Sequence, residues 1–113
     1  MHGPGAVDLI ATIDVSPGQH GEVLRMLQEY GEQVRAEPGN LRFEVYSSDA
    51  PGRSVVVLER YASQDAFDAH LRDPANARFN EALARLTGGA ASSLELLEAA
   101  ASTPVTRAPR PAR

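Results

Sequence analysis

Residues 54–61 carry the pattern that most restricts the fold of this chain. The segment contains the apolar run Val55-Val56-Val57-Leu58, and successive side chains of a strand point to opposite faces, so both faces would be apolar. Strands of this kind are covered on both sides of their sheet. One layer of helices covers one side, and nothing left in the chain could supply the other cover. The sequence therefore predicts a homodimer whose two sheets face each other and bury more than roughly 1,000 Å².

Three further segments are predicted as strands. Residues 7–15 alternate between apolar and polar side chains, as a half-buried strand does. Residues 41–46 alternate in the same way, and the loop at 47–53, which contains Asp, Pro and Gly, favours a hairpin with 54–61. Residues 93–98 are predicted as a fourth strand, although their pattern is also compatible with a helix.

Capping residues predict three helices. The segment Ser16–Gln19 offers a serine cap, a proline for the first helical position and a glutamine that completes a capping box. The long helix that follows ends at Pro38-Gly39. Ser63 caps a short helix, and Asp73-Pro74 starts another, which ends at Thr87-Gly88-Gly89. The resulting order predicts an α+β fold, a four-stranded antiparallel sheet that carries its helices on one face.

The length of 113 residues and the mass of 12.1 kDa fit one domain. Residues 1–5 are predicted as a flexible N-terminus because they are rich in Gly and Pro, and residues 6–100 as the folded domain. Residues 101–113 contain Ala, Pro, Thr and Arg without apolar periodicity, and are predicted as a disordered basic tail.

Composition excludes several classes of function. The absence of cysteine rules out disulfides, thiolate nucleophiles and most structural zinc sites, and the absence of lysine rules out Schiff-base chemistry. The net charge is −4, and the body is more acidic still because three arginines lie beyond residue 100, so no nucleic-acid partner is expected. No apolar run approaches the roughly 20 residues of a membrane span, and no secretory signal is recognisable. A cytoplasmic location is expected.

Four short segments together resemble one protein family. They are Val15-Ser16-Pro17-Gly18 after the first strand, Glu37-Pro38-Gly39-Asn40-Leu41 after the long helix, Leu58-Glu59-Arg60-Tyr61 followed by Ala66, and His70 in the short helix. In this order and spacing they resemble the antibiotic biosynthesis monooxygenase (ABM) domain over about residues 7–98. The resemblance implies a ferredoxin-like fold that assembles as a dimeric α/β-barrel.

The resemblance also implies an activity. Such domains use dioxygen to oxidise quinols, phenols or polyketide-derived aromatics without metal, flavin or haem. His70 matches the first histidine of the family pattern, and Phe79 matches a following aromatic residue. The second histidine is replaced by Ala75, and the third-strand Asn and Trp of haem-degrading and polyketide-oxidising members are Val57 and Tyr61 here. These departures argue against haem degradation and leave the substrate open.

His70 is the candidate catalytic base, because a neutral imidazole with an ordinary pKa of about 6.5 can accept a substrate proton. The alternative is a core histidine bonded to the backbone or to Glu59. Glu59 lies in an apolar strand, where a carboxylate is costly unless it is paired. It would contact substrate, orient His70, or form a structural pair with an arginine or with helix amides.

Three further residues are candidates for substrate binding, namely Asn76, Phe79 and Tyr61. Asn76 would share a helix face with Phe79 and hydrogen-bond a carbonyl or a dioxygen-derived group, or else the backbone near the helix start. Tyr61, like Tyr30, offers a phenol donor, with core packing as the alternative. No metal site is expected, since the other histidines, in the N-terminus and in a first helical turn, form no i, i+4 pair.

Two other functions stay open. One is a non-catalytic small-molecule binder or stability factor on the same fold, which the missing second histidine, Asn and Trp favour. The other is an isomerase of small carbonyl compounds, which also needs a base and an oxyanion site. Because the chain has no lysine, binding of a phosphorylated substrate would depend on arginine.

Overall fold

The computed structural model describes residues 5–47, 54–87 and 93–98. Within these ranges, seven elements follow one another: β1 (Val7–Asp14), α1 (His20–Arg35), β2 (Asn40–Ser47), β3 (Ser54–Tyr61), α2 (Gln64–Arg72), α3 (Pro74–Leu86) and β4 (Ser93–Leu97). The predicted order is confirmed, and the ambiguous segment near residue 95 is a strand. The predicted C-terminal tail and most of the predicted flexible N-terminus lie outside the described residues.

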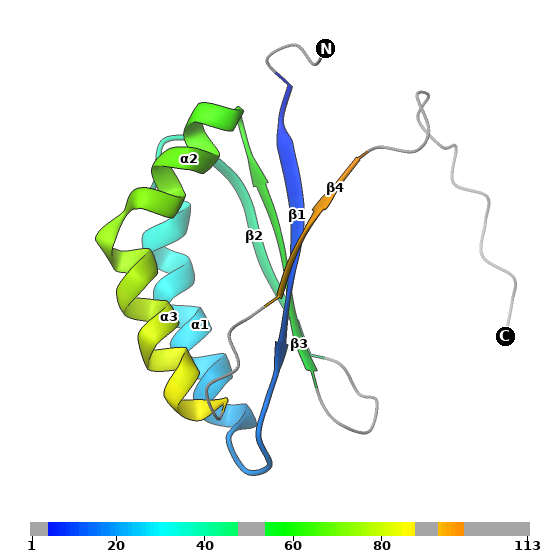
Figure 1. The fold of residues 1–113 in the computed structure, drawn as a ribbon, viewed down its shortest axis with the longest axis vertical. Helices are drawn as coiled ribbons and strands as arrows, with labels where there is room; N and C mark the ends of the chain where they lie inside the picture. Colours follow the sequence, from blue (N-terminus) through cyan, green and yellow to red (C-terminus); the bar gives the residue numbers. More distant parts are fainter. Residues whose placement is uncertain (1–4, 48–53, 88–92, 99–113) are drawn as a thin grey trace, which may run out of the picture.

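The four strands form one antiparallel sheet in the order β2-β3-β1-β4. The predicted pairing of β2 with β3 is confirmed, and β1 pairs with β3 along its full length. All three helices lie on the same side of the sheet (Figure 1). This is the ferredoxin-like α+β fold, as the sequence predicts.

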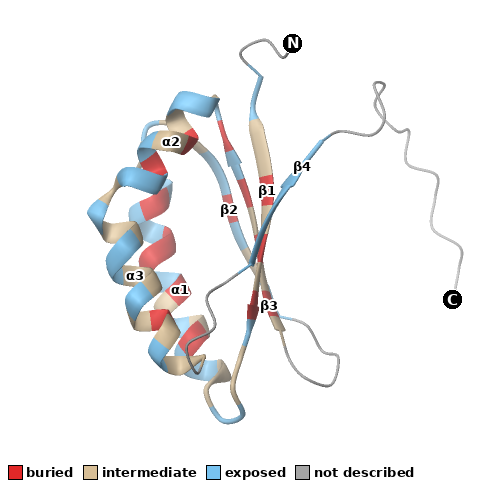
Figure 2. Cartoon of the chain, in the orientation of Figure 1, coloured by how far each residue is buried: buried red, intermediate tan, exposed pale blue. Residues whose placement is uncertain are grey.

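The hydrophobic core lies between the sheet and the helices (Figure 2). Alternate residues of β1 and β3 point into it and meet the apolar stripe of α1. Its buried members include Ala11, Ile13, Val23, Leu27, Val34, Phe43, Val55, Val57 and Leu83. Glu59 and His70 are the polar residues among the buried ones of the described chain, and both belong to the candidate site.

The other face of the sheet carries no helix of the described chain (Figure 1). Ile10 of β1 and Val56 and Leu58 of β3 lie there, half-buried by their neighbours within the sheet. At the edge of this apolar strip, Arg60 forms an ion pair with Asp8 at 2.7 Å. We call this side the open face. The apolar run of β3 therefore places apolar side chains on both faces of the sheet, as its sequence predicts.

The predicted start of the first helix is wrong. Helix α1 begins at His20, and its N-cap Gln19 makes no side-chain capping bond. The preceding residues form a turn instead, in which the Gln19 N–H donates to the Ser16 carbonyl at 3.0 Å and Gly18 has φ 85°. Proline followed by a glycine with positive φ is the combination of a type II turn, and here it prevails over the capping box.

The other two helix starts are confirmed. Ser63 accepts a hydrogen bond from the Ala66 N–H at 3.1 Å at the start of α2. Asp73 accepts one from the Ala75 N–H at 2.9 Å, with Pro74 in the first position of α3. Because Asp73 both ends α2 and caps α3, the two helices join without a loop. This junction holds the C-terminal end of α2 and the first turn of α3 close together.

Candidate active site

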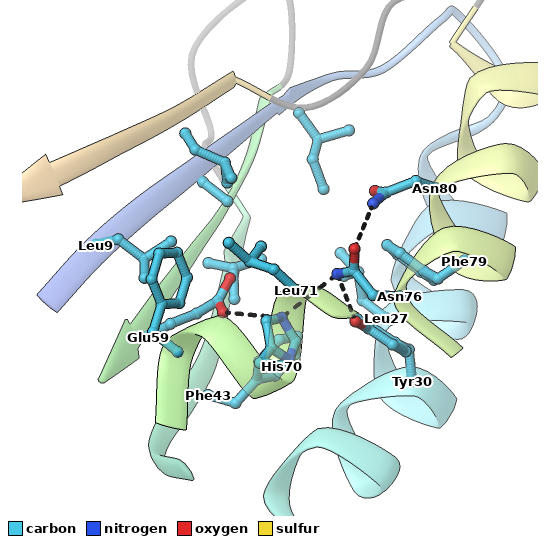
Figure 3. A pocket seen from close by; sticks show the side chains of 15 residues that line it. Leu9, Leu27, Tyr30, Phe43, Glu59, His70, Leu71, Asn76, Phe79 and Asn80 are labelled. Carbon is cyan, nitrogen blue, oxygen red and sulfur yellow. Dashed lines mark hydrogen bonds and ion pairs between the residues drawn. The ribbon is translucent and has the colours of Figure 1, made fainter. Parts of the chain in front are cut away.

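A pocket opens between the sheet and the three helices (Figure 3). The cavity has a volume of about 90 Å³. By a similar measure, one water molecule needs roughly 10–15 Å³. Most of its wall is apolar, with Leu9, Ala11, Ile13, Leu27, Phe43, Val57, Phe67, Leu71, Phe79 and Leu94. The polar residues of the wall are Tyr30, Glu59, His70, Asn76 and Asn80. A small, largely apolar ligand fits this composition.

His70 projects from α2 and is 5% exposed. Its Nδ1 lies 3.0 and 3.1 Å from the two carboxylate oxygens of Glu37. Its Nε2 lies 3.4 Å from Nδ2 of Asn76 and 4.0 Å from Oε1 of Glu59. The core-histidine alternative named the backbone or Glu59 as the partner, whereas the observed partner is Glu37. The opposite ring nitrogen, Nε2, is the one near the polar residues of the wall (Figure 3).

Glu59 reaches the pocket from β3 and is 8% exposed. Burial raises the pKa of its carboxyl group, although the hydrogen bond from Tyr61 and the nearby His70 act in the opposite direction. The Tyr61 hydroxyl donates that hydrogen bond to Oε1 at 2.7 Å. None of the predicted pairing partners, an arginine or helix amides, is the observed one.

The structure does not bring Tyr61 to the pocket wall. Its side chain is fully buried at the end of β3, where the ring packs against Phe67 at 5.3 Å between centroids and against His70 at 4.9 Å. Burial raises the pKa of its hydroxyl, and the neighbouring Glu59 carboxylate adds to the effect. Tyr61 alternates with Glu59 on the same face of the strand, so it lies one strand position further along, beyond the pocket. Its contact is with Glu59, not with the cavity.

Asn76 and Phe79 both line the pocket from α3, on one helix face as their spacing predicts. Nδ2 of Asn76 donates to the Tyr30 hydroxyl at 3.0 Å, and Oδ1 accepts from Nδ2 of Asn80 at 3.2 Å. The side chain thus bonds other side chains of the site instead of the helix backbone. The Phe79 ring stacks on Tyr30 with 4.2 Å between centroids. Burial raises the pKa of Tyr30 to about 12, which keeps this phenol neutral.

Sequence reasoning assigned no role to Glu37 or Asn80. Glu37 is 33 residues from His70 and follows α1 in a turn, in which the Asn40 N–H donates to the Glu37 carbonyl at 3.1 Å. A signal was present at Gly39, where a Cβ atom would overlap that of Ala66 in α2. Close approach of this turn to α2 requires the glycine, and it brings Glu37 to His70. Which residue of α2 it would meet could not be read from the sequence.

Among the residues that the structure describes, no group of three or more His, Cys, Asp or Glu side chains could hold a metal ion. His20 instead lies on the surface, with Nε2 2.9 Å from the Ser47 hydroxyl. No helix within the described ranges is long and apolar enough to cross a membrane.

The fold and the pocket define a class of protein, a ferredoxin-like α+β domain with a largely apolar cavity between its sheet and its helices. The family model described as antibiotic biosynthesis monooxygenase matches residues 7–82. The chain belongs to this ABM family. The sequence-based identification of the family is thereby confirmed.

Solved structures agree with this assignment. A Caulobacter crescentus CB15 protein, whose description places it with the antibiotic biosynthesis monooxygenases, is 27% identical with a TM-score of 0.77, over 87% of this chain and 92% of that one. Rv0793 of Mycobacterium tuberculosis shares the fold at 24% identity and a TM-score of 0.73, over 92% and 99% of the two chains. A Nitrosomonas europaea protein has the same fold at 17% identity and a TM-score of 0.77, again over 92% of this chain and 99% of that one. Among curated proteins no significant match is found.

Proposed function

We propose that the protein is a cofactor-independent monooxygenase that oxidises a quinol, a phenol or a polyketide-derived aromatic, with His70 as the base. The observation that carries the proposal is the placement of His70. Its imidazole is buried at the wall of an apolar pocket, with Nδ1 held by a carboxylate and Nε2 on the side of Asn76 and Glu59. Membership of the ABM family supports the same reaction class.

The reaction follows from the chemistry of an electron-rich ring. Nε2 takes the proton of a ring hydroxyl, and the anion that remains is a stronger one-electron reductant. It passes an electron to dioxygen, and the two radicals combine to form a C–O bond and, once protonated, a hydroperoxide. Loss of a ring C–H proton and cleavage of the O–O bond release water and leave a quinone. The substrate supplies all four electrons that reduce dioxygen, so no further reductant enters.

The pocket residues would bind and orient the substrate. Burial raises the pKa of the Glu59 carboxyl group, and in its protonated form this group donates a hydrogen bond to a substrate oxygen. Asn76 contributes the N–H now 3.4 Å from His70, which is long enough to exchange for a bond to substrate. Phe79 and the aliphatic wall exclude water, which strengthens these interactions and protects the peroxide intermediate. Tyr61 acts indirectly, by holding Glu59 in place.

We also propose that the protein works as a homodimer through its open face. Ile10, Val56 and Leu58 form an apolar strip there, and the described helices all lie on the other side. A second copy would cover it, as the family's known dimers suggest. The lack of cysteine is compatible with a cytoplasmic setting.

A non-catalytic binder on the same fold is the second candidate. It is favoured by the observation that the described part of the chain has no buried side-chain N or O atom without a hydrogen-bond partner, so the site is already satisfied without substrate. An isomerase of phosphorylated carbonyl compounds is less well supported, because the residues that line the pocket in the described chain include no arginine.

Oxygen uptake by the purified protein with a panel of dihydroxynaphthalenes and anthrones separates these candidates. A monooxygenase consumes one dioxygen per quinone formed, and the quinone is followed by its absorbance. Binding of a panel member, detected by calorimetry, with no enzyme-dependent oxygen uptake would favour the non-catalytic binder and contradict the proposal.

A further inference from the structure

We infer that Glu37 is a positioning residue that holds His70 in the tautomer with its proton on Nδ1, so that Nε2 presents a lone pair to the pocket. The catalytic consequence rests on the proposed function, whereas the tautomer itself can be measured without any substrate. Glu37 lies outside the pocket wall, so it acts through His70 and not on the substrate.

The first support comes from the donors and acceptors around the ring. Both oxygens of Glu37 lie within hydrogen-bond distance of Nδ1, at 3.0 and 3.1 Å. An ionised carboxylate only accepts hydrogen bonds, so Nδ1 must donate. On the other side, Nδ2 of Asn76 only donates, so Nε2 at 3.4 Å must accept. Glu37 lies in the turn after α1 and Asn76 lies in α3, and both contacts select the same tautomer.

The second support is that the orientation of Asn76 is itself fixed. Its Oδ1 accepts from Asn80, and its Nδ2 also donates to the Tyr30 hydroxyl. Exchanging the oxygen and nitrogen of Asn76 alone would place Nδ2 of Asn80 against another donor. The donor side of Asn76 therefore faces His70, and a proton on Nε2 would oppose it.

The third support is the way the fold holds Glu37. The turn after α1 is tied to the end of β3 by the Ala62 N–H, which donates to the Gly39 carbonyl at 2.8 Å. The absence of a side chain at Gly39 lets the turn rest on Ala66, one helical turn before His70. The Glu37 side chain is 20% exposed, and the imidazole beside it is 6% exposed. The partner is close and fixed by backbone contacts.

The tautomer decides whether His70 can act as a base. With the proton on Nε2, the ring would direct an N–H at the substrate hydroxyl and could not take its proton. With the proton on Nδ1, Nε2 accepts it, and the imidazolium that forms lies beside a carboxylate in apolar surroundings. Four titratable groups face the ring, namely Glu37 at Nδ1, Glu59 near Nε2, and Tyr30 and Tyr61 against its faces. Of these, Glu59 is the one that would stabilise the opposite tautomer.

The test is a long-range ¹H–¹⁵N NMR spectrum of the imidazole rings in the uniformly ¹⁵N-labelled full chain at alkaline pH, where an ordinary imidazole is neutral. The expected result is a protonated Nδ1 and an unprotonated Nε2 in His70, with half-buried His20 as the internal reference. A protonated Nε2 in the wild-type protein overturns the inference, and this arm requires no variant to fold.

Two variants sharpen the test. In Glu37→Ala the acceptor at Nδ1 is gone, so the His70 proton should shift toward Nε2, where Glu59 can accept it; in Glu59→Gln the tautomer should stay as in the wild type. An unchanged tautomer in Glu37→Ala would mean that Asn76 alone sets it, and the role of Glu37 would be lost. If Glu37→Ala does not fold, the isosteric Glu37→Gln, which lacks the charge, is measured in its place and should show a mixed population.

Turnover of any substrate found supplies the catalytic arm. Glu37→Ala should lower kcat roughly 10²-fold with little change in KM, and Glu37→Asp should restore part of the loss. An unchanged kcat with the expected tautomer would show that Glu37 sets the tautomer but not the rate. Equal rates in His70→Ala and the wild type would instead remove His70 from the mechanism, leaving the NMR result to stand by itself.

Discussion

Strand β3 presents two different surfaces to the two sides of the sheet. On the helix-covered side it places Val57 and Glu59 beneath the helices, at the pocket wall. On the open face it places Val56 and Leu58 with no helix of the described chain over them, and Arg60 at the edge in an ion pair. The apolar residues are alike on both sides, so the difference lies in where the polar groups are and what they contact.

The covered side carries the groups proposed for the reaction, and the open face carries the surface proposed for the dimer. The polar groups of the covered side are buried or half-buried and bonded to one another, from Glu37 through His70 and Asn76 to Tyr30. Such a network is stable only when every member has a partner, and a water-poor site increases the strength of each interaction. The open face has an apolar centre and charges at its edge, which is the layout of a protein–protein interface. Mutations on the two faces should therefore change different measurements.

The largest effect is expected from His70→Ala on the covered side. Loss of a positioned base should lower turnover by about 10²–10⁴-fold, while the protein stays folded and dimeric. The limb of the pH–rate profile in the range where histidines ordinarily titrate should disappear with it. The matched control is His20→Ala, a surface histidine whose removal leaves the profile unchanged. A loss of tenfold or less with the same profile would assign the ionisation to the substrate and leave His70 a structural residue.

The next largest effect is expected from Leu58→Arg, which should disrupt the proposed dimer contact on the open face. A guanidinium at the centre of an apolar interface has no partner there, and leaving a charge buried and unpaired costs about 3–5 kcal/mol. Sedimentation at micromolar concentration should change from a dimer to a monomer of 12.1 kDa, while the circular dichroism spectrum is retained. Arg60→Leu, at the edge of the same face, serves as the control and should leave the dimer intact. A wild-type protein that sediments as a monomer would contradict the dimer proposal directly.

Val56 and Val57 are neighbours in sequence that point to opposite faces, which makes their alanine variants a matched pair. Val57 is 1% exposed in the core, so Val57→Ala should lower the free energy of unfolding by about 2 kcal/mol at any protein concentration. Val56→Ala should act through the dimer, so its effect on Tm should depend on protein concentration. Equal, concentration-independent losses in both variants would show that the open face is not an interface.

Periodicity and capping residues predicted most of the fold because they act locally. The caps at Ser63 and Asp73 depend on hydrogen bonds within two or three residues, and both are observed. The same local reasoning was wrong at Ser16, because Pro17-Gly18 suits a turn as well as a helix start, and only the position of α1 against the sheet decides between them.

The candidate site was predictable in part. His70 and Asn76 could be found because each lies on the buried stripe of its own helix, and the family resemblance pointed to His70. The partner of His70 could not be found from the sequence. Glu37 is 33 residues away along the chain and reaches His70 because its turn packs on α2. Alternation also gave Tyr61 the correct face of β3 but not its distance from the cavity, which the end of the strand determines.

The smallest effect is expected in the pH dependence of stability, where the two faces should respond with opposite sign. Burial raises the pKa of Glu59, so the folded state binds more protons than the unfolded state above about pH 4.5, and stability falls as the pH rises through that window. On the open face, the hydrogen bond from Arg60 lowers the pKa of Asp8 below 3.8, so its contribution is present at neutral pH and lost as the pH falls.

Glu59→Gln and Asp8→Asn test this difference of sign. Denaturant unfolding from about pH 2 to 7 should give a Glu59→Gln variant that is more stable than the wild type at pH 7, with the advantage shrinking toward pH 4, because the substituted amide stays neutral and its oxygen still accepts from Tyr61. Asp8→Asn should be slightly less stable at pH 7, and the deficit should shrink at low pH as the wild-type carboxylate is protonated. A Glu59→Gln variant that loses stability at pH 7 would mean that Glu59 is an ionised partner of His70, and the neutral hydrogen-bond donor proposed for the pocket would have to be abandoned.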